Sequence, residues 1–169
     1  MKVITLTQPW ATLVAIGAKR IETRSWSTSY RGPLAIHAAA GLGPVGGRTG
    51  LHALCGSHPF WDVLQPAGYS AMRIPAWGMP LGAVVAVCRL EACVDTLFMN
   101  LEGRARVTGF DGEQRYWNLT DQERAFGDYT PGRYAWLLAN VRALPEPIPA
   151  KGALGLWNYD LPAAVLSEV

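Results

Sequence analysis

Four ionisable side chains crowd into six residues near the amino terminus, at Lys19, Arg20, Glu22 and Arg24. Residues two apart on a strand project from the same face, so Glu22 and Arg24 are expected side by side. Lys19 follows Gly17, where the chain turns, and can reach the same face. A carboxylate flanked by two cations stays ionised and orients their side chains. The remaining positive charge could bind a phosphate, or Glu22 could accept a hydrogen bond from a base N–H.

The same spacing also fits a solvated edge strand whose surface ion pairs contribute only ~0–1 kcal/mol each. Composition does not decide between the two interpretations. Fifteen Lys and Arg residues oppose thirteen Asp and Glu residues, which leaves a net charge of +2. That excess is too small to indicate a nucleic-acid-binding protein by itself. Attraction for phosphate must come from local clustering, and Arg31 and Lys151 could widen a basic rim or be solvated loop charges.

Aromatic side chains form the second group of candidates, since the chain holds seven Trp and six Tyr residues. Trp26 continues the alternation of Glu22 and Arg24 and is therefore expected on their face. Trp10 and Trp157 are the other candidates. A pocket that takes an extruded base stacks it on aromatic faces, which is worth ~1–3 kcal/mol per base. Most Trp residues are core residues, so each of the three is open between packing and stacking.

Short strands and helices are expected to position these residues. Alternating or apolar runs predict strands over residues 3–6, 20–26, 34–38, 81–94, 134–141 and 153–159. Helical spacing predicts helices over residues 8–16, within 51–64, from 121 to 126 and in the tail from 161. Thr7 is expected to cap the first helix and Gly17 to end it, while Thr120 opens a capping box with Glu123.

Glycine and proline mark the expected loops, which cover residues 41–50, 65–80 and most of 97–117. Strands outnumber helices, and the regular strand–helix alternation of a doubly wound sheet is missing. The pattern predicts an α+β fold with a small mixed sheet or barrel and peripheral helices. The length of 169 residues fits one domain over 1–169.

Several classes of protein are disfavoured by what the sequence holds. Half of the residues are hydrophobic, which argues against disorder. Cys55, Cys88 and Cys93 form no CxxC pair, which argues against a disulfide framework and a structural zinc site. His37 lies in an apolar strand with no metal-ligand partner at a suitable spacing. No stretch reaches the ~20 apolar residues of a membrane span. We therefore expect no metal, no cofactor, no membrane association and a cytoplasmic location.

A series of segments, in order along the chain, resembles one known family. It begins with Gln8-Pro9-Trp10 and continues with Gly17-x-Lys19-x-x-Glu22-x-Arg24, followed later by Lys151-Gly152-x-x-Gly155-Leu156-Trp157. These segments resemble the ASCH domain, named for activating signal cointegrator-1 homology, of the PUA-like superfamily. The motif G-x-K-x-x-E-x-R is typical of that family, and all four of its fixed positions match. Similar pieces span residues 1–40, 81–95 and 134–160, with the middle unmatched.

The resemblance implies a PUA-like small β-barrel with peripheral helices and a cleft between the barrel and the first helix, lined by the G-x-K-x-x-E-x-R motif. Family members have been linked to RNA and DNA binding and to transcription coactivation. The first hypothesis is therefore a module that binds RNA, DNA or a nucleotide. In it, Lys19 and Arg24 contact phosphate, with Arg31 and Lys151 as further candidates. Glu22 orients the cations or reads a base edge, and Trp26 stacks on a base.

The family also implies an alternative, since a few bacterial branches are enzymes. One branch is an acetylcytidine amidohydrolase that uses a Lys, a Thr three residues later and a distant Glu. Lys19 matches the Lys, but Glu22 stands in the place of the Thr, and Glu123 is a candidate for the distant Glu. The second hypothesis is a hydrolase of a modified nucleoside or of RNA, with Lys19 as the reactive group and Glu22 beside it. The third is a protein-interaction barrel with a merely solvated charged strand.

Overall fold

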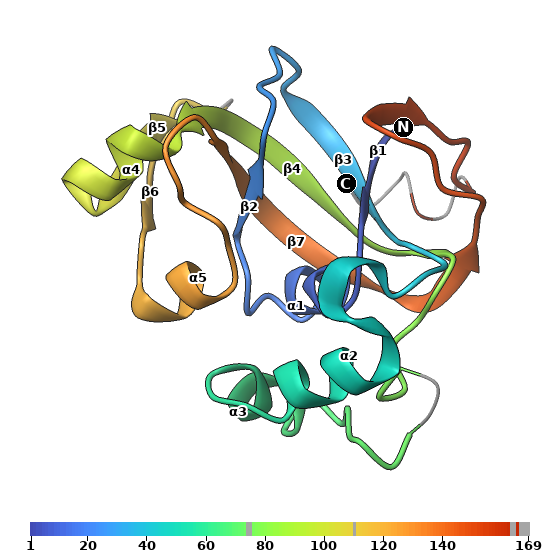
Figure 1. Cartoon of the computed structure of the whole chain (residues 1–169). Coiled ribbons are helices and arrows are strands. Elements are labelled where there is room, and N and C mark those ends of the chain that lie inside the picture. Colours follow the sequence, from blue (N-terminus) through green and yellow to red (C-terminus); the bar gives the residue numbers. More distant parts are fainter. Residues whose placement is uncertain (74–75, 110, 163–164, 166–169) are drawn as a thin grey trace. The chain divides into compact units, whose positions relative to one another are not determined.

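The computed structural model describes residues 1–73, 76–109, 111–162 and 165 (Figure 1). Its elements are, in chain order, β1 (Lys2–Leu6), α1 (Trp10–Ala15), β2 (Ile21–Arg24), β3 (Gly32–Ala38), the 3-10 helix η1 (Gly43–Val45), α2 (Gly47–Cys55), α3 (Phe60–Leu64), β4 (Ala83–Asp95), α4 (Thr96–Glu102), β5 (Arg104–Thr108), β6 (Gln114–Asn118), α5 (Asp121–Ala125), β7 (Tyr134–Pro149) and β8 (Leu156–Asn158). The α+β class predicted from the sequence is confirmed. Within the described residues, no helix combines the length and the apolar character that crossing a membrane requires.

The chain divides into two compact units, each built from separate segments. The first unit comprises residues 1–18, 33–88 and the described part of 141–169, and the second comprises residues 19–32 and 89–140. The long strands β4 and β7 run through both units. A single domain over 1–169 stays a prediction.

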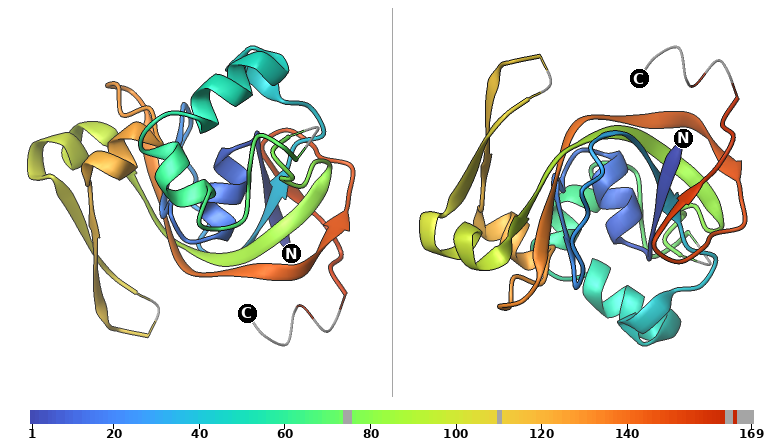
Figure 2. Two further views of the ribbon diagram at one scale, coloured as in Figure 1. Left: turned by 90° about the horizontal axis from the view of Figure 1, so that it is seen from below. Right: turned by 90° about the horizontal axis from the view of Figure 1, so that it is seen from above.

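In the first unit the hydrogen-bonded strand order is β7-β4-β3-β1-β8. The sheet is mixed, because β1 pairs in parallel with β3 and antiparallel with β8. Figure 2 shows the strands of this unit curving around α1, whose Leu13 and Val14 are fully buried. One core cluster of this unit comprises Val3, Ala35, Val84, Val87, Leu144 and Leu161.

The start of α1 differs from the expectation that Thr7 caps it. Pro9 occupies the cap position and makes no side-chain cap bond. Instead, Gln8 accepts a hydrogen bond on its Oε1 from the backbone N–H of Thr12 at 3.1 Å and donates to the carbonyl of Pro80 at 2.8 Å. The predicted stop at Gly17 is confirmed, since this glycine has a φ of +77° just beyond the helix.

In the second unit β2 pairs antiparallel with β7, so that Ile21 lies opposite Leu137 and Arg24 opposite Tyr134. Strands β5 and β6 form a separate two-stranded antiparallel ribbon. The core of this unit is a cluster of buried side chains, Ile21, Ala92, Met99, Ala105, Trp117, Leu119, Tyr129, Ala135, Leu137 and Ala139. This cluster packs the β5–β6 ribbon and α4 against β2, the strand that carries Glu22 and Arg24.

Two of the segments predicted to be loops contain helices or strands, so these predictions are wrong in part. Residues 97–117 hold α4, β5 and β6, because Asp95 caps α4 through the N–H of Leu97 and Gly103 ends that helix with a φ of +65°. Residues 41–50 contain η1 and the first turn of α2. The predicted helix after Thr120 is confirmed as α5, and the expected tail helix falls largely on residues outside the described part.

Candidate nucleic-acid site

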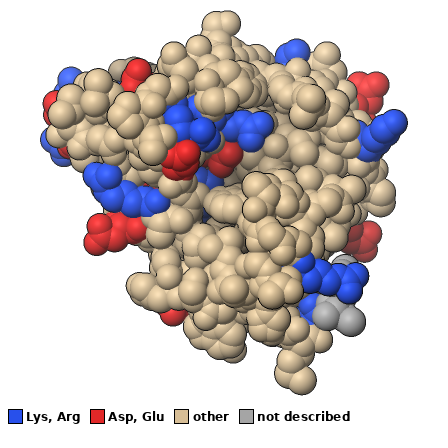
Figure 3. All heavy atoms as spheres, in the orientation of Figure 1, with Lys and Arg blue, Asp and Glu red and all other residues tan. Residues whose placement is uncertain are grey.

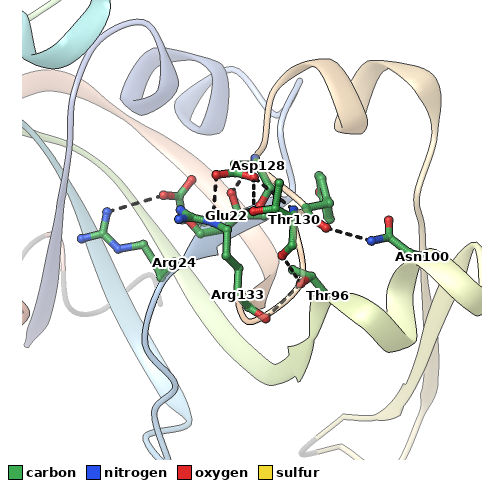
Figure 4. A network of polar contacts seen from close by, with 9 residues as sticks. Glu22, Arg24, Thr96, Asn100, Asp128, Thr130 and Arg133 are labelled. Carbon is green, nitrogen blue, oxygen red and sulfur yellow. Dashed lines mark hydrogen bonds and ion pairs between the residues drawn. The ribbon is translucent and has the colours of Figure 1, made fainter.

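Strand β2 places Glu22 and Arg24 on one face, as their spacing predicts. A guanidinium nitrogen of Arg24, Nη1, lies 3.6 Å from Oε1 of Glu22 (Figure 4). The Glu22 side chain is 10% exposed and the Arg24 side chain 25% exposed. The carboxylate is therefore almost out of water, whereas its cationic partner still reaches the surface.

Lys19 approaches the same carboxylate from the protein interior. Its ammonium lies 3.5 Å from Oε2 of Glu22 and donates a hydrogen bond to the carbonyl of Ile21. The side chain is 0% exposed. Contact of Lys19 with a phosphate stays a prediction. Each oxygen of Glu22 thus has a cation beside it, one buried and one partly exposed, and this arrangement fixes the carboxylate.

Trp26 lies just beyond the end of β2 and completes this surface. Its ring meets that of the fully buried Trp136 edge to face, with centroids 4.7 Å apart, and Trp136 donates from Nε1 to the carbonyl of Trp26 at 3.3 Å. The guanidinium of Arg24 lies over the Trp26 ring, 5.8 Å from its centroid. Trp136, which faces Glu22 across the strand pair, was missed from the sequence because nothing in its own segment distinguishes it from core.

Glu123 of α5 lies near Lys19. Thr120 caps this helix by accepting from the N–H of Glu123 at 3.1 Å, and the Glu123 carboxylate accepts from the backbone N–H of Arg20 at 2.6 Å. Burial raises the pKa of Glu123, and the charge of Lys19 with the N–H groups of Arg20 and Ile21 partly offsets that rise. Its other oxygen, Oε2, is buried and has no hydrogen-bond partner among the described residues.

Tyr129 joins the same buried group of polar side chains. Burial raises the pKa of its phenol strongly, and the negative charges of Glu123 and Glu22 raise it further. Its hydroxyl has no hydrogen-bond partner in the described part of the chain. Lys19, Glu22, Glu123 and Tyr129 are called the buried polar cluster below. Arg24, which pairs with Glu22 of this cluster, and Trp26 are only half-buried.

The loop before β7 is tied to β2 by a polar network (Figure 4). The N–H of Asp128 donates to Oγ1 of Thr23 at 2.9 Å, and Nε of Arg133 lies 3.3 Å from the Asp128 carboxylate. Thr96 donates to the carbonyl of Thr130 at 2.9 Å. Hydrogen bonds from the N–H and hydroxyl of Thr130 lower the pKa of Asp128. The network holds Tyr129, which lies between Asp128 and Thr130, in its place.

The other predicted site residues are not part of this group. Arg31 is half-buried and donates from Nη1 to the carbonyls of Thr28 at 2.8 Å and Tyr30 at 2.7 Å, so its own loop engages it. Trp10 and Lys151 belong to the first unit, as does α1, so the cleft that the resemblance implies stays a prediction. Trp10 is half-buried and Lys151 is exposed.

Trp157, also in the first unit, makes contacts typical of packing. Its Nε1 donates to Oγ1 of Thr5 at 3.1 Å, and its ring meets that of His37 edge to face. His37 is buried, and its Nε2 lies 3.0 Å from the carbonyl oxygen of Ala150. Within the described residues, no group of three or more His, Cys, Asp or Glu side chains could hold a metal ion.

The visible surface in Figure 3 carries charges of both signs. Where β2 and α5 lie in that view, Lys and Arg side chains stand next to Asp and Glu side chains rather than forming one basic field. This agrees with the ion pairs that Glu22 and Asp128 make with Arg24 and Arg133. Any ligand of this surface must be recognised by oriented groups more than by net charge.

The family model described as "ASCH domain" matches residues 4–148, which is more than half of the chain. The chain belongs to the ASCH family. The expected PUA-like fold with peripheral helices is thereby confirmed along with its α+β class. Among solved structures, this ASCH protein is similar to a point mutant of ZmASCH from Zymomonas mobilis, with 17% identity, a TM-score of 0.44, and coverage of 88% of this chain and 74% of that chain. No curated protein matches the chain.

Proposed function

We propose that this ASCH domain binds nucleic acid or a nucleotide at the exposed edge of β2. Arg24 donates to a phosphate or a base carbonyl, Trp26 packs against a base, and Glu22 orients Arg24. Lys19 acts from the interior by fixing Glu22. The observation that carries the proposal is the position of Arg24, which is held between a nearly buried carboxylate and a half-buried tryptophan ring while a quarter of its side chain stays exposed.

The guanidinium group suits this role because it is planar and has five N–H donors in a fixed fork. Only one of its nitrogens faces Glu22 at 3.6 Å, so other N–H groups remain to donate to a ligand oxygen. An oriented arginine loses less side-chain freedom on binding than a free one. The ring of Trp26 beside it offers the stacking surface that bases use, worth ~1–3 kcal/mol per base.

The charge balance supports recognition of a few groups rather than of a long polyanion. Lys19 and Arg24 carry two positive charges against the one negative charge of Glu22, and Glu123 is close enough to offset the remainder. Because Lys19 is fully buried and Arg24 reaches the surface, binding through Arg24 alone should neutralise about one phosphate. For a single strand, the dependence of log K on log salt concentration would then have a slope of about −0.7.

The test is a titration of single-stranded RNA, single-stranded DNA and mononucleotides at several salt concentrations. Arg24→Gln should weaken binding and reduce the salt slope by about 0.7. Arg48→Gln, at an exposed arginine of α2, removes the same charge elsewhere and should leave both quantities unchanged. Equal affinities and equal slopes for the wild type and Arg24→Gln would overturn the proposal.

One observation favours the alternative hydrolase function, namely that Glu123 lies close enough to Lys19 for the two charges to interact. A lysine and a distant glutamate are two of the three residues that the amidohydrolase branch is expected to use. Glu22 takes the place of the third, and the full burial of Lys19 opposes a direct attack on substrate. Incubation with acetylated cytidine or with RNA, beside Lys19→Ala and Glu123→Gln, decides the matter. Turnover that is absent from the wild type, or that persists in both variants, excludes this function.

A further inference from the structure

We propose that the outer face of the β5–β6 ribbon is a second contact surface for single-stranded nucleic acid. The inference rests on the proposed function, which it extends from one anchored arginine to a longer strand. The ribbon face is defined by six alternating residues, Arg104, Arg106, Thr108, Gln114, Tyr116 and Asn118.

The register of the ribbon brings these side chains to one side. Arg104 lies opposite Asn118, Arg106 opposite Tyr116, and Thr108 opposite Gln114. Directly opposed residues of an antiparallel pair point to the same face. Burial confirms the assignment, since all six residues of the ribbon face are exposed whereas Ala105 and Trp117 are buried.

The composition of the ribbon face matches a nucleic-acid strand. It has two cations, an aromatic ring and three uncharged hydrogen-bonding side chains, and no carboxylate. Among the described residues, neither Arg104 nor Arg106 forms an ion pair, whereas Arg115 on the opposite face is paired with Asp111. The exposed arginines therefore remain available for phosphates, which take charge-assisted hydrogen bonds from guanidinium groups.

Tyr116 adds a feature that distinguishes nucleic acids from other polyanions, namely an aromatic ring on which a base can stack. Its side chain is 46% exposed, and the guanidinium of Arg104 lies over its ring at 5.3 Å from the centroid. Base–aromatic stacking tolerates any sequence because every base has a π-face. Unpaired bases present such faces to a protein, whereas the stacked pairs of a duplex cover them. The geometry thus favours a single strand over a duplex.

The ribbon is held firmly enough to serve as a platform. Trp117 donates from Nε1 to the carbonyl of Leu138 at 3.3 Å and belongs to the same core cluster as Ile21 of β2. The guanidinium of Arg20 lies over the Trp117 ring at 5.8 Å. Figure 2 shows the strands of the ribbon projecting away from α4 and α5 of the same unit. The motif strand and the ribbon are therefore connected through one core.

The experiment measures binding of the full chain to single-stranded RNA and DNA of about twelve nucleotides, to the matching duplex, and to polyglutamate. Tyr116→Ala should weaken binding of the single strands at least about fivefold, and Tyr116→Phe, which keeps the ring, should not. Arg104→Gln/Arg106→Gln should lower the salt slope by up to about 1.4. Arg48→Gln/Arg73→Gln removes two exposed arginines of the first unit and serves as the charge-matched control.

The outcomes separate this inference from the proposed function. If Arg24→Gln weakens binding while all ribbon variants bind as the wild type, the β2 site stands and the ribbon proposal is overturned. If the ribbon variants alone weaken binding, the ribbon stands and the β2 site fails. A duplex or polyglutamate that binds as tightly as the single strands, or equal losses in Tyr116→Ala and Tyr116→Phe, also contradicts the ribbon proposal.

Discussion

Replacing Lys19 by methionine tests whether the buried polar cluster works as described. Methionine is of similar length and fills the site, but it removes the cation from beside Glu22 and Glu123, which are both buried. Removing one partner of a buried ion pair destabilises by ~3–5 kcal/mol. Arg24 stays 3.6 Å from Glu22 and continues to offset its charge, so we expect the lower end, about 3 kcal/mol. For a chain of this size that corresponds to a fall in Tm of roughly 6–12 °C.

The loss should depend on pH in a defined direction. The charge of Lys19 lowers the pKa of Glu123, which burial raises, so the Lys19→Met variant should hold the Glu123 proton up to a higher pH. A carboxyl whose pKa is raised by folding destabilises the folded state as the pH rises through that pKa. The difference between wild type and variant is therefore largest at neutral and higher pH. It shrinks as the pH falls and Glu123 becomes protonated.

Urea denaturation followed by tryptophan fluorescence at about pH 7.5 and about pH 5 measures this difference. Lys151→Met, at an exposed lysine, is the control and should change the free energy of unfolding by less than about 0.5 kcal/mol. A loss below about 1 kcal/mol for Lys19→Met would refute the cluster as a buried ion pair. So would a loss of equal size at both pH values.

Three further predictions concern single contacts. Thr120→Ala removes the cap that accepts from the N–H of Glu123 and should lower the free energy of unfolding by ~1 kcal/mol, whereas Thr120→Ser should not, as denaturant titration would show. Gly152→Ala should lower the free energy of unfolding by ~1–3 kcal/mol in the same assay, because the new methyl group would come within 2.5 Å of Cε1 of the buried His37 ring. An unchanged denaturation midpoint would contradict this packing. Cys88 is buried, and burial raises its pKa to about 12, so it should resist thiol reagents until the protein unfolds; rapid labelling of the native protein contradicts its burial.

The arrangement along β2 could be predicted because it follows from local geometry. The period of two placed Glu22 and Arg24 together, and the ion pair between them agrees. The capping box predicted the start of α5, although only half of it forms. The Glu123 carboxylate accepts from the N–H of Arg20, a residue 103 positions away, instead of reaching back to Thr120.

The interior position of Lys19 could not be predicted from its neighbours. A lysine after a helix-ending glycine is usually exposed, and its burial here depends on carboxylates from β2 and α5 together. Trp136 and Tyr129 were also missed because their roles depend on residues far away in the sequence. Trp136 lies beside Glu22 through the pairing of β2 with β7, and Tyr129 is positioned by a loop that Asp128 and Thr130 fix.

The ribbon was missed for a different reason. Glycines at Gly103, Gly109 and Gly112 suggested a loop, but they lie between α4, β5 and β6 rather than within them. The alternation of Arg104, Ala105 and the residues that follow was visible in the sequence. Two of the polar positions in this alternation are arginines rather than the β-branched or aromatic residues that strands favour, so the pattern indicated a strand only weakly.

A double-mutant cycle on binding affinity tests the central claim most directly, using Glu22→Gln, Arg24→Gln and the combined variant with a single-stranded oligonucleotide. If Glu22 acts through Arg24, the loss caused by Glu22→Gln in the wild-type background should vanish once Arg24 is glutamine. Independent losses that simply add, or undiminished affinity in Arg24→Gln, would contradict the account.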